Sequence, residues 1–116
     1  MKPQRIQLRR AKGWRMPPDT VKVDRSTKWG NPFVVKPGRT RDYAVKLFGG
    51  MLQGYLCISC DSPTPDEQKA YRRMVILDHA ELRGKNLACW CPIGAPCHAD
   101  VLLALAHDKI AVAEQR

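Results

Sequence analysis

The hydrophobic pattern first predicts two short strands near the N-terminus. Polar and apolar residues alternate over Arg5–Arg9 and again over Thr20–Asp24, as they do in a strand with one buried face. The second segment also contains β-branched residues, which fit a pleated surface. Prolines and glycines interrupt the following segment, 25–41, too often for a helix. We therefore expect a long loop there, and long loops in compact domains are often functional.

Helical spacing of apolar residues predicts three helices. The first covers Asp42–Leu56, the second begins at a capping box of Thr64 and Glu67 and stops before Gly84, and the third runs from His98 to about Ala111. The positions expected to face the core are Ala44, Leu47, Phe48, Met51, Leu52 and Tyr55 in the first helix, Ala70, Tyr71, Met74, Val75 and Leu77 in the second, and Val101, Leu102, Leu105 and Ala106 in the third.

A third strand completes the predicted fold. Asn86–Cys91 is a short apolar run between Gly84 and Pro92, which is typical of a buried strand. The resulting order β-β-loop-α-α-β-α predicts a single small α/β domain over residues 1–116, with a sheet that is at least partly parallel. Ligands of such sheets bind at the carboxyl ends of the strands. The loops 25–41 and 91–97 both follow strands, so we expect them to flank one pocket.

Positive charge is distributed unevenly along the chain. Of the 20 Lys and Arg residues, thirteen lie within residues 1–48, where only three residues are acidic. The first half therefore carries the whole net charge of +9, and residues 49–116 are close to neutral. This segregation favours a phosphate-bearing partner, either a nucleotide or a nucleic acid. The alternative is a solvated basic face that has no partner.

Composition excludes several classes of protein. The 116 residues are enough for one domain, and the hydrophobic content of 44% is sufficient for a modest core. The chain lacks any apolar run of about 18 residues, which a membrane span needs, and its basic N-terminus is not followed by the apolar segment of a secretory signal. We therefore expect a cytoplasmic protein. The cysteines are odd in number, so we expect reduced thiols rather than a disulfide scaffold.

Cysteine and histidine are concentrated near the end of the third strand. Cys89 and Cys91 alternate with Trp90 and should project from the same face of the strand. Cys97 and His98 coincide with the start of the last helix, where backbone N–H groups and the helix dipole stabilise a thiolate. Free cysteines are also common core residues, and this alternative applies most directly to Cys89.

A zinc site is one interpretation of this cluster. Three thiols and one imidazole are the ligand types of tetrahedral zinc, so Cys89, Cys91, Cys97 and His98 are candidate ligands. The single Cys-x-Cys spacing differs from the paired Cys-x-x-Cys knuckles of structural zinc sites. The 57–60 segment does have knuckle spacing, and its two cysteines either complete the site or simply form the end of the first helix.

A nucleophile is the other functional interpretation. Cys91 lies between a strand and a tight loop, which is a geometry that exposes a nucleophile beside an anion-binding helix end. His98 is the candidate general acid or base. Asp100 either orients His98 or favours the helix N-terminus through its charge. The sequence leaves open whether the cluster is catalytic, metal-binding or structural.

The loop after the second strand combines cations, hydrogen-bonding groups and an aromatic ring. Its candidate ligand-binding residues, with the first residues of the next helix, are Arg25, Ser26, Lys28, Trp29, Gly30, Asn31 and Arg41. The cations suit a phosphate, Trp29 offers a face for stacking a base, and Gly30 permits close backbone approach. The alternative is a turn that Trp29 and Phe33 anchor in the core.

Two of these segments carry a resemblance to a known family. They are Ser-Thr-Lys-Trp-Gly-Asn-Pro-Phe at 26–33, followed by Arg41-Asp42, and Leu-Arg-Gly-Lys-Asn-Leu-Ala-Cys-Trp-Cys at 82–91, which continues to Pro-Cys-His-Ala-Asp-Val-Leu at 96–102. The chain resembles the domain-of-unknown-function family 4326 of bacteria and phages. The resemblance implies that these positions are the family signature. Cys57 and Cys60 lie outside it, and the family supplies no activity.

These observations predict a small α/β protein that binds or processes a nucleotide or a nucleic-acid base. The 25–41 loop would hold the base and phosphate, while Cys91 and His98 would supply any chemistry. One alternative is a non-enzymatic module that zinc stabilises and that binds nucleic acid through its basic half. Another is a phage or host interaction protein without a small ligand.

Overall fold

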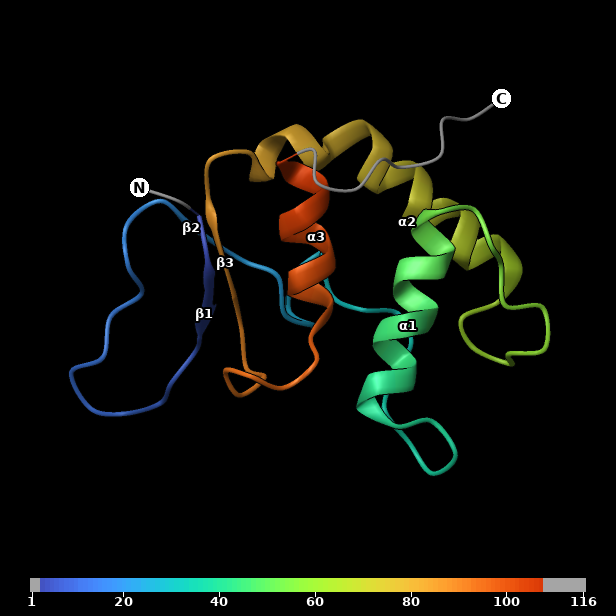
Figure 1. Ribbon diagram of the computed structural model, residues 1–116, viewed down its shortest axis with the longest axis horizontal. Helices are drawn as coiled ribbons and strands as arrows, with labels where there is room; N and C mark the ends of the chain where they lie inside the picture. The colour runs from blue at the N-terminus through green and yellow to red at the C-terminus, as the bar shows by residue number, and fades with distance from the viewer. Residues whose placement is uncertain (1–2, 108–116) are drawn as a thin grey trace.

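The computed structural model describes residues 3–107 and shows strands and helices in the predicted order (Figure 1). The elements are β1 (Arg5–Gln7), β2 (Thr20–Lys22), α1 (Arg41–Leu52), α2 (Pro65–Asp78), the short 3-10 helix η1 (His79–Leu82), β3 (Asn86–Cys89) and α3 (His98–Ala106). The predicted α/β fold class is confirmed. The third helix was expected to reach about Ala111, and residues 108–111 lie outside the described part of the chain.

The sheet has the order β1-β3-β2, and both pairs of neighbouring strands are parallel. Gln7 is paired with Cys89, and Lys22 is paired with Ala88, so all three strands end at the same edge. β3 is fully buried at Leu87 and at Ala88 because neighbours cover both of its edges and a helix packs against it. This burial explains why its sequence is continuously apolar rather than alternating.

The helices lie on one side of the sheet in successive layers (Figure 1). α3 packs against β3 and β1, α1 packs against α3, and α2 packs against α1. The core between them includes Phe33, Phe48, Met51, Leu87 and Leu102, all of which are fully buried. None of the helices within residues 3–107 has the length and apolar character that a membrane crossing requires.

The predicted start of the second helix is confirmed, and the predicted end of the first helix is not. The Thr64 hydroxyl accepts a hydrogen bond from the Glu67 N–H, and the Glu67 carboxylate accepts one from the Thr64 N–H, which is the expected capping box. α1, by contrast, ends at Leu52 rather than Leu56, because Gly54 adopts a left-handed φ of 100°. Tyr55 therefore lies beyond the helix and is 77% exposed, so its predicted burial is wrong.

The buried stripe of α2 also differs from the prediction. Val75 is buried as expected, but Leu77 is 73% exposed and Ala70 is exposed. Gln68 is fully buried instead, since its side-chain amide holds the backbone of the preceding segment. It accepts a hydrogen bond from the Cys57 N–H and donates to the Cys57 and Pro63 carbonyls. A polar side chain with all of its hydrogen bonds made can occupy a core position.

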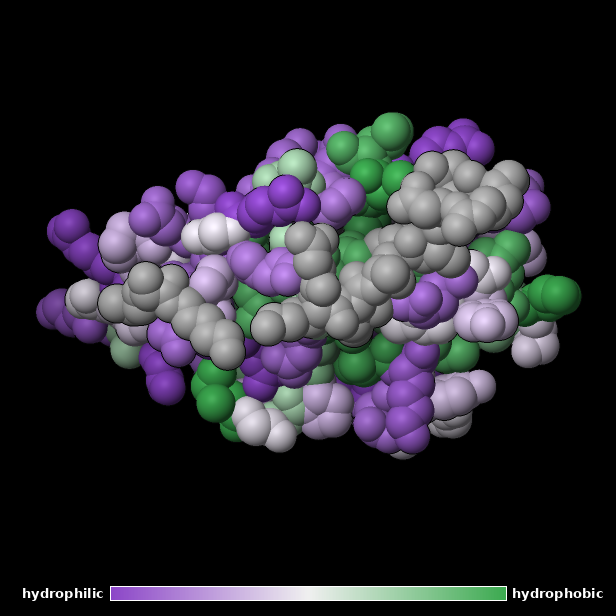
Figure 2. Space-filling view, turned by 45° about the horizontal axis from the view of Figure 1, so that its top comes forward, coloured by the Kyte–Doolittle hydropathy of each residue, from purple (hydrophilic) through white to green (hydrophobic). Residues whose placement is uncertain are grey.

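The N-terminal part of the molecule presents a hydrophilic surface. The 8–19 loop between β1 and β2 exposes Arg9, Arg10, Lys12 and Arg15. Figure 2 shows that hydrophilic side chains cover most of this end of the molecule. The uneven charge of the sequence therefore appears partly as an exposed basic loop.

Trp29 is a core residue that fixes the long loop to helix α2. Its side chain is 3% exposed and packs in the main hydrophobic cluster. The Tyr71 hydroxyl donates a 2.8 Å hydrogen bond to the Trp29 carbonyl. Next to it, the Lys28 ammonium lies 2.9 Å from Asp78 and 3.1 Å from Glu81. The loop is thus anchored by both burial and polar contacts.

We expect Trp29→Ala to lower the free energy of unfolding by about 3–5 kcal/mol, because truncating a buried Trp leaves a large cavity. That is a large share of the stability of an average small domain. Urea unfolding monitored by circular dichroism measures the change. Trp14→Ala is the matched control, since Trp14 is only half-buried. A loss below about 1 kcal/mol for Trp29→Ala would show that the ring does not anchor the loop.

Candidate functional site

A pocket of about 320 Å³ lies at the carboxyl ends of β2 and β3. Its wall consists of residues 24–25 after β2, residues within 31–35 of the long loop, the first turns of α1, and residues 89–91 and 96–98 around the turn between β3 and α3. The two loops expected to flank one pocket therefore do so. The reason is the parallel sheet, which brings the ends of β2 and β3 to one edge.

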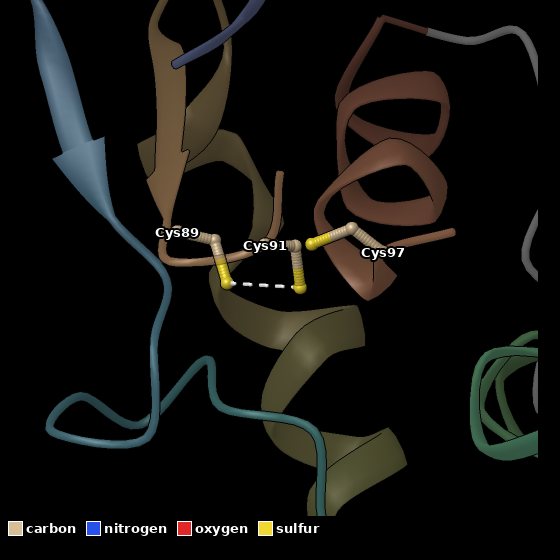
Figure 3. Close-up of side chains that lie close together, drawn as sticks. All are labelled: Cys89, Cys91 and Cys97. Carbon is tan, nitrogen blue, oxygen red and sulfur yellow. Dashed lines mark hydrogen bonds between the residues drawn. The ribbon is translucent and has the colours of Figure 1, made fainter. Parts of the chain in front are cut away.

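Three thiols converge in this pocket. The sulfur atoms of Cys89, Cys91 and Cys97 all lie within 4.8 Å of one another, and those of Cys89 and Cys91 are 3.9 Å apart. Figure 3 shows that Cys89 and Cys91 point in the same direction and that Cys97 approaches them from the start of α3. Tetrahedral zinc with bonds of about 2.3 Å to sulfur separates its sulfur ligands by about 3.8 Å. The cluster can therefore hold a metal ion.

The Arg5 side chain brings Cys97 to the other two thiols. Its guanidinium donates hydrogen bonds of 2.9 Å to the carbonyls of Pro92 and Ala95 and a 3.1 Å bond to the Asp100 carboxylate. These bonds hold the turn that connects β3 with α3. Cys97 is the N-cap of α3, and its sulfur accepts a 3.4 Å hydrogen bond from the Ala99 N–H. The predicted position of Cys97 at a helix start is confirmed.

The three thiols differ in their acidity. A hydrogen bond from the Cys97 thiol lowers the pKa of Cys89 to about 5, because it stabilises the Cys89 thiolate. The same hydrogen bond, together with burial, raises the pKa of Cys97. Burial raises the pKa of Cys91. The ionised thiol of the cluster is therefore Cys89, whereas the sequence favours Cys91 as the nucleophile and a core role for Cys89.

His98 lies beside the thiols and is held in one orientation. Its Nε2 is 2.7 Å from the Val23 carbonyl, so Nε2 carries the proton, and Nδ1 is left with a lone pair 3.8 Å from the Cys97 sulfur. The ring edge packs against Phe48, and burial lowers the pKa of the imidazole. His98 does not belong to the close group formed by the three sulfur atoms. Asp100 does not orient it, since the Asp100 carboxylate pairs with Arg5.

The candidate residues of the long loop separate into two sets. Arg25, Asn31 and Arg41 line the pocket. Ser26, Lys28, Trp29 and Gly30 are not part of its wall. Lys28 pairs with acidic residues of α2 and η1, and Trp29 is buried, so Trp29 has no open ring face on which a base could stack.

Several of these residues, whether or not they line the pocket, shape the loop. The Asn31 amide donates to the Ala44 carbonyl, and its oxygen accepts from the Phe33 N–H. A Cβ at position 30 would lie 2.8 Å from the Arg25 Cα, so Gly30 permits a close approach to the chain's own backbone. Ser26 donates from its hydroxyl and its N–H to the Asp24 carboxylate. The loop motif thus positions Asp24 and Arg25.

Among the pocket residues absent from the sequence-based candidates, Trp90 and Asp24 form a hydrogen-bonded pair. Trp90 is 41% exposed, lies beneath the Arg10 guanidinium at 4.7 Å, and donates from its indole nitrogen to Asp24 at 2.9 Å. Burial opposes ionisation of Asp24, but the hydrogen bonds from Ser26 and Trp90 outweigh it and lower the pKa of the carboxyl. Strand alternation predicts Trp90 on the face opposite to Cys89 and Cys91, but β3 ends at Cys89 and all three residues line the pocket. The sequence pattern also does not reveal the partner Asp24.

The expectation that the cysteines are reduced is wrong for two of them. Cys57 and Cys60 are joined by a disulfide bond, so this pair is not reduced as expected. Its sulfur atoms are consequently not available as ligands of a metal at the Cys89 cluster. Cys89, Cys91 and Cys97 are free thiols.

We expect the metal-free protein to contain about one thiolate at neutral pH, since the pKa of Cys89 is about 5. The ultraviolet absorbance of thiolates, followed during a pH titration in the presence of a chelator, measures it. The transition near pH 5 should disappear in Cys89→Ser and persist in the double variant Cys57→Ser/Cys60→Ser. A signal that appears only near the ordinary thiol pKa of about 8.5 would contradict this assignment.

Comparison with known proteins identifies the family of this chain. A family model described as a domain of unknown function, DUF4326, matches residues 6–108, a range that includes every residue of the pocket. No curated protein and no solved structure matches the chain. The resemblance inferred from the two sequence motifs is thereby confirmed. Because the match covers most of its length, the chain belongs to the DUF4326 family.

Proposed function

We propose that this protein binds a mononucleotide in the pocket at the carboxyl ends of β2 and β3. The observation that carries the proposal is the combination of two arginines, an exposed indole and an apolar wall around one cavity of about 320 Å³. A pocket of this size is at the small end of the range for small-molecule sites. A phosphate would bind the arginines, and a base would bind the indole and the apolar wall.

The cations account for a phosphate group. Arg41 lies in the first turn of α1, and Arg25 is oriented by a 3.0 Å hydrogen bond to the Asn31 carbonyl. Both guanidinium groups belong to the pocket wall, and both side chains are exposed. Arginine binds phosphate through several parallel hydrogen bonds, which are stronger than those between neutral groups.

The apolar wall accounts for a base. Trp90 replaces Trp29 in the proposed stacking role, because Trp90 lines the pocket and its indole is partly exposed. Val34 and Val35 expose about half of their side chains at the same cavity, with Phe33 buried behind them. Stacking on an aromatic side chain accepts any base, so this wall supports binding without dictating which base is bound.

The other cations of the first half divide between contacts within the protein and the solvent-exposed surface. Arg5 binds the turn before α3, Lys28 pairs with Asp78 and Glu81, and Arg39 is buried. Three of the thirteen cations in the first half therefore contact the protein itself, whereas Arg9, Arg10, Lys12 and Arg15 of the 8–19 loop are exposed. A nucleic acid would bind through exposed cations, and its affinity would fall steeply with salt.

We expect nucleoside 5′-monophosphates to change the fluorescence of Trp90 on binding. Trp90→Phe should remove this change, while Trp14→Phe should retain it, because Trp14 is not part of the pocket wall. Arg41→Gln should weaken binding at least tenfold, about 1.4 kcal/mol, because it removes a charged contact to phosphate. Titration of each variant with adenosine, guanosine, cytidine and uridine monophosphates measures these effects.

The matched control for Arg41 is Lys46→Gln. Lys46 lies on the same helix and carries the same charge, but it does not line the pocket. Equal weakening by both variants would indicate a general charge effect. Failure of all four monophosphates to bind at millimolar concentration and low salt would contradict the proposal. Salt-dependent binding of a single-stranded oligonucleotide without any mononucleotide binding would favour the nucleic-acid alternative instead.

A second proposal concerns the thiols, because three sulfur atoms within 4.8 Å of one another are a suitable set of zinc ligands. We infer that Cys89, Cys91 and Cys97 bind a zinc ion at the floor of the pocket. Zinc would link the end of β3 to the start of α3 and so stabilise one wall of the pocket. Arg5 holds the same two segments together from the side of β1.

We expect protein purified without added zinc to contain about one equivalent of the metal. Cys91→Ser should lose most of it, and the double variant Cys57→Ser/Cys60→Ser should retain it, since the disulfide-bonded cysteines lie outside the cluster. Elemental analysis measures the content. Less than about one-tenth of an equivalent in the unmodified protein would reject the zinc centre, because structural zinc binds tightly enough to survive purification.

A further inference from the structure

We propose that the metal held by Cys89, Cys91 and Cys97 keeps its fourth coordination position open toward the pocket, and that a nitrogen or oxygen atom of the bound nucleotide replaces a water molecule there. This inference rests on both proposed sites and adds a direct contact between them. It also distinguishes two kinds of centre, since structural zinc sites have four protein ligands and sites that react with ligands have three.

The composition of the cluster supports three protein ligands. Within residues 3–107, no His, Asp, Glu or further Cys ligand atom lies within 4.8 Å of all three sulfur atoms. All three cysteines belong to the pocket wall, and Cys91 is partly exposed. A ligand in the pocket would therefore lie beside these cysteines.

His98 is the residue that could close the site, and its contacts oppose this. Its Nδ1 approaches the Cys97 sulfur at 3.8 Å, but His98 is not within 4.8 Å of the whole sulfur group. The Val23 carbonyl holds Nε2 at 2.7 Å, and Phe48 packs against the ring at a centroid distance of 5.3 Å. Moving the imidazole onto the metal would disturb both contacts.

The surroundings of the thiolates make an open metal position chemically useful. Three thiolates and one Zn²⁺ carry a net charge of −1, which weakens the metal as a Lewis acid. The Ala99 N–H donates a 3.4 Å hydrogen bond to the Cys97 sulfur at the N-terminus of α3. This interaction withdraws electron density from the sulfur, so the metal keeps affinity for a fourth donor atom.

The nucleotide is the donor that the rest of the pocket would orient. Arg25, Arg41 and Trp90 line the same pocket as the three cysteines, so a nucleotide bound to them would lie beside the thiols. Bases offer ring nitrogens and exocyclic oxygens, and phosphates offer oxygen atoms. The shared requirement is a small donor atom that can enter the first coordination shell of the metal.

Cobalt substitution of the full chain tests this inference, because Co²⁺ reports its coordination through visible absorption and its thiolate ligands through charge-transfer bands. We expect sodium azide, a small probe that needs an open position, to shift the visible bands saturably. Adenosine 5′-monophosphate should also shift them and should weaken azide binding at least tenfold at saturation. His98→Gln should retain the charge-transfer bands and the azide response.

The outcomes distinguish failure of this inference from failure of the proposed nucleotide site or of the proposed metal site. Uptake of cobalt with thiolate bands but without any response to azide would overturn the open position and indicate a closed site. A response to azide that the nucleotide does not alter, although the nucleotide changes Trp90 fluorescence, would overturn the contact between nucleotide and metal. Absence of cobalt uptake would overturn the metal centre itself and leave the nucleotide site to its own test. Each of these three outcomes is read on the unmodified sequence, so none of them depends on whether His98→Gln folds.

Discussion

The pairing of β3 with a parallel neighbour on each edge is the constraint on which the site depends. The Leu8 N–H donates to the Cys89 carbonyl, and the Val23 N–H donates to the Ala88 carbonyl, both at 2.8 Å. These bonds bring the ends of three strands to one edge, although residues 8, 23 and 89 are far apart in the chain. The residues that follow β2 and β3 then share a pocket as a direct consequence of register.

Two further contacts convert that edge into a defined cavity. On one side, Arg5 reaches from β1 to the carbonyls of Pro92 and Ala95 and so holds the turn that carries Cys97. On the other side, buried Trp29 anchors the long loop against α2. From charge or aromaticity alone, both Arg5 and Trp29 would be assigned to ligand binding. Their structural use leaves Arg25, Arg41 and Trp90 as the pocket groups that can meet a ligand.

The cluster of thiols gives this pocket its chemical character. One thiolate at Cys89 is stabilised by a neighbouring thiol in the absence of metal, and the same three sulfurs form a suitable ligand set in its presence. The proposed metal and nucleotide sites therefore meet on one wall. A protein of this size has few places where a soft metal ligand set, two guanidinium groups and an exposed indole can face one cavity, and the parallel sheet edge supplies one.

Local sequence patterns were sufficient wherever neighbouring residues control the outcome. Alternation located β1 and β2, a continuous apolar run located β3, and the Thr64 capping box located the start of α2. The closeness of Cys89 and Cys91 was expected from their separation by one residue. Side-chain burial and pairing were not predictable in this way. The burial of Trp29, the exposure of Tyr55 and the capture of Asp100 by Arg5 depend on residues distant in sequence. An aromatic or charged side chain can lie either in the core or in the pocket. Only its contacts with residues distant in sequence determine which of the two positions it takes.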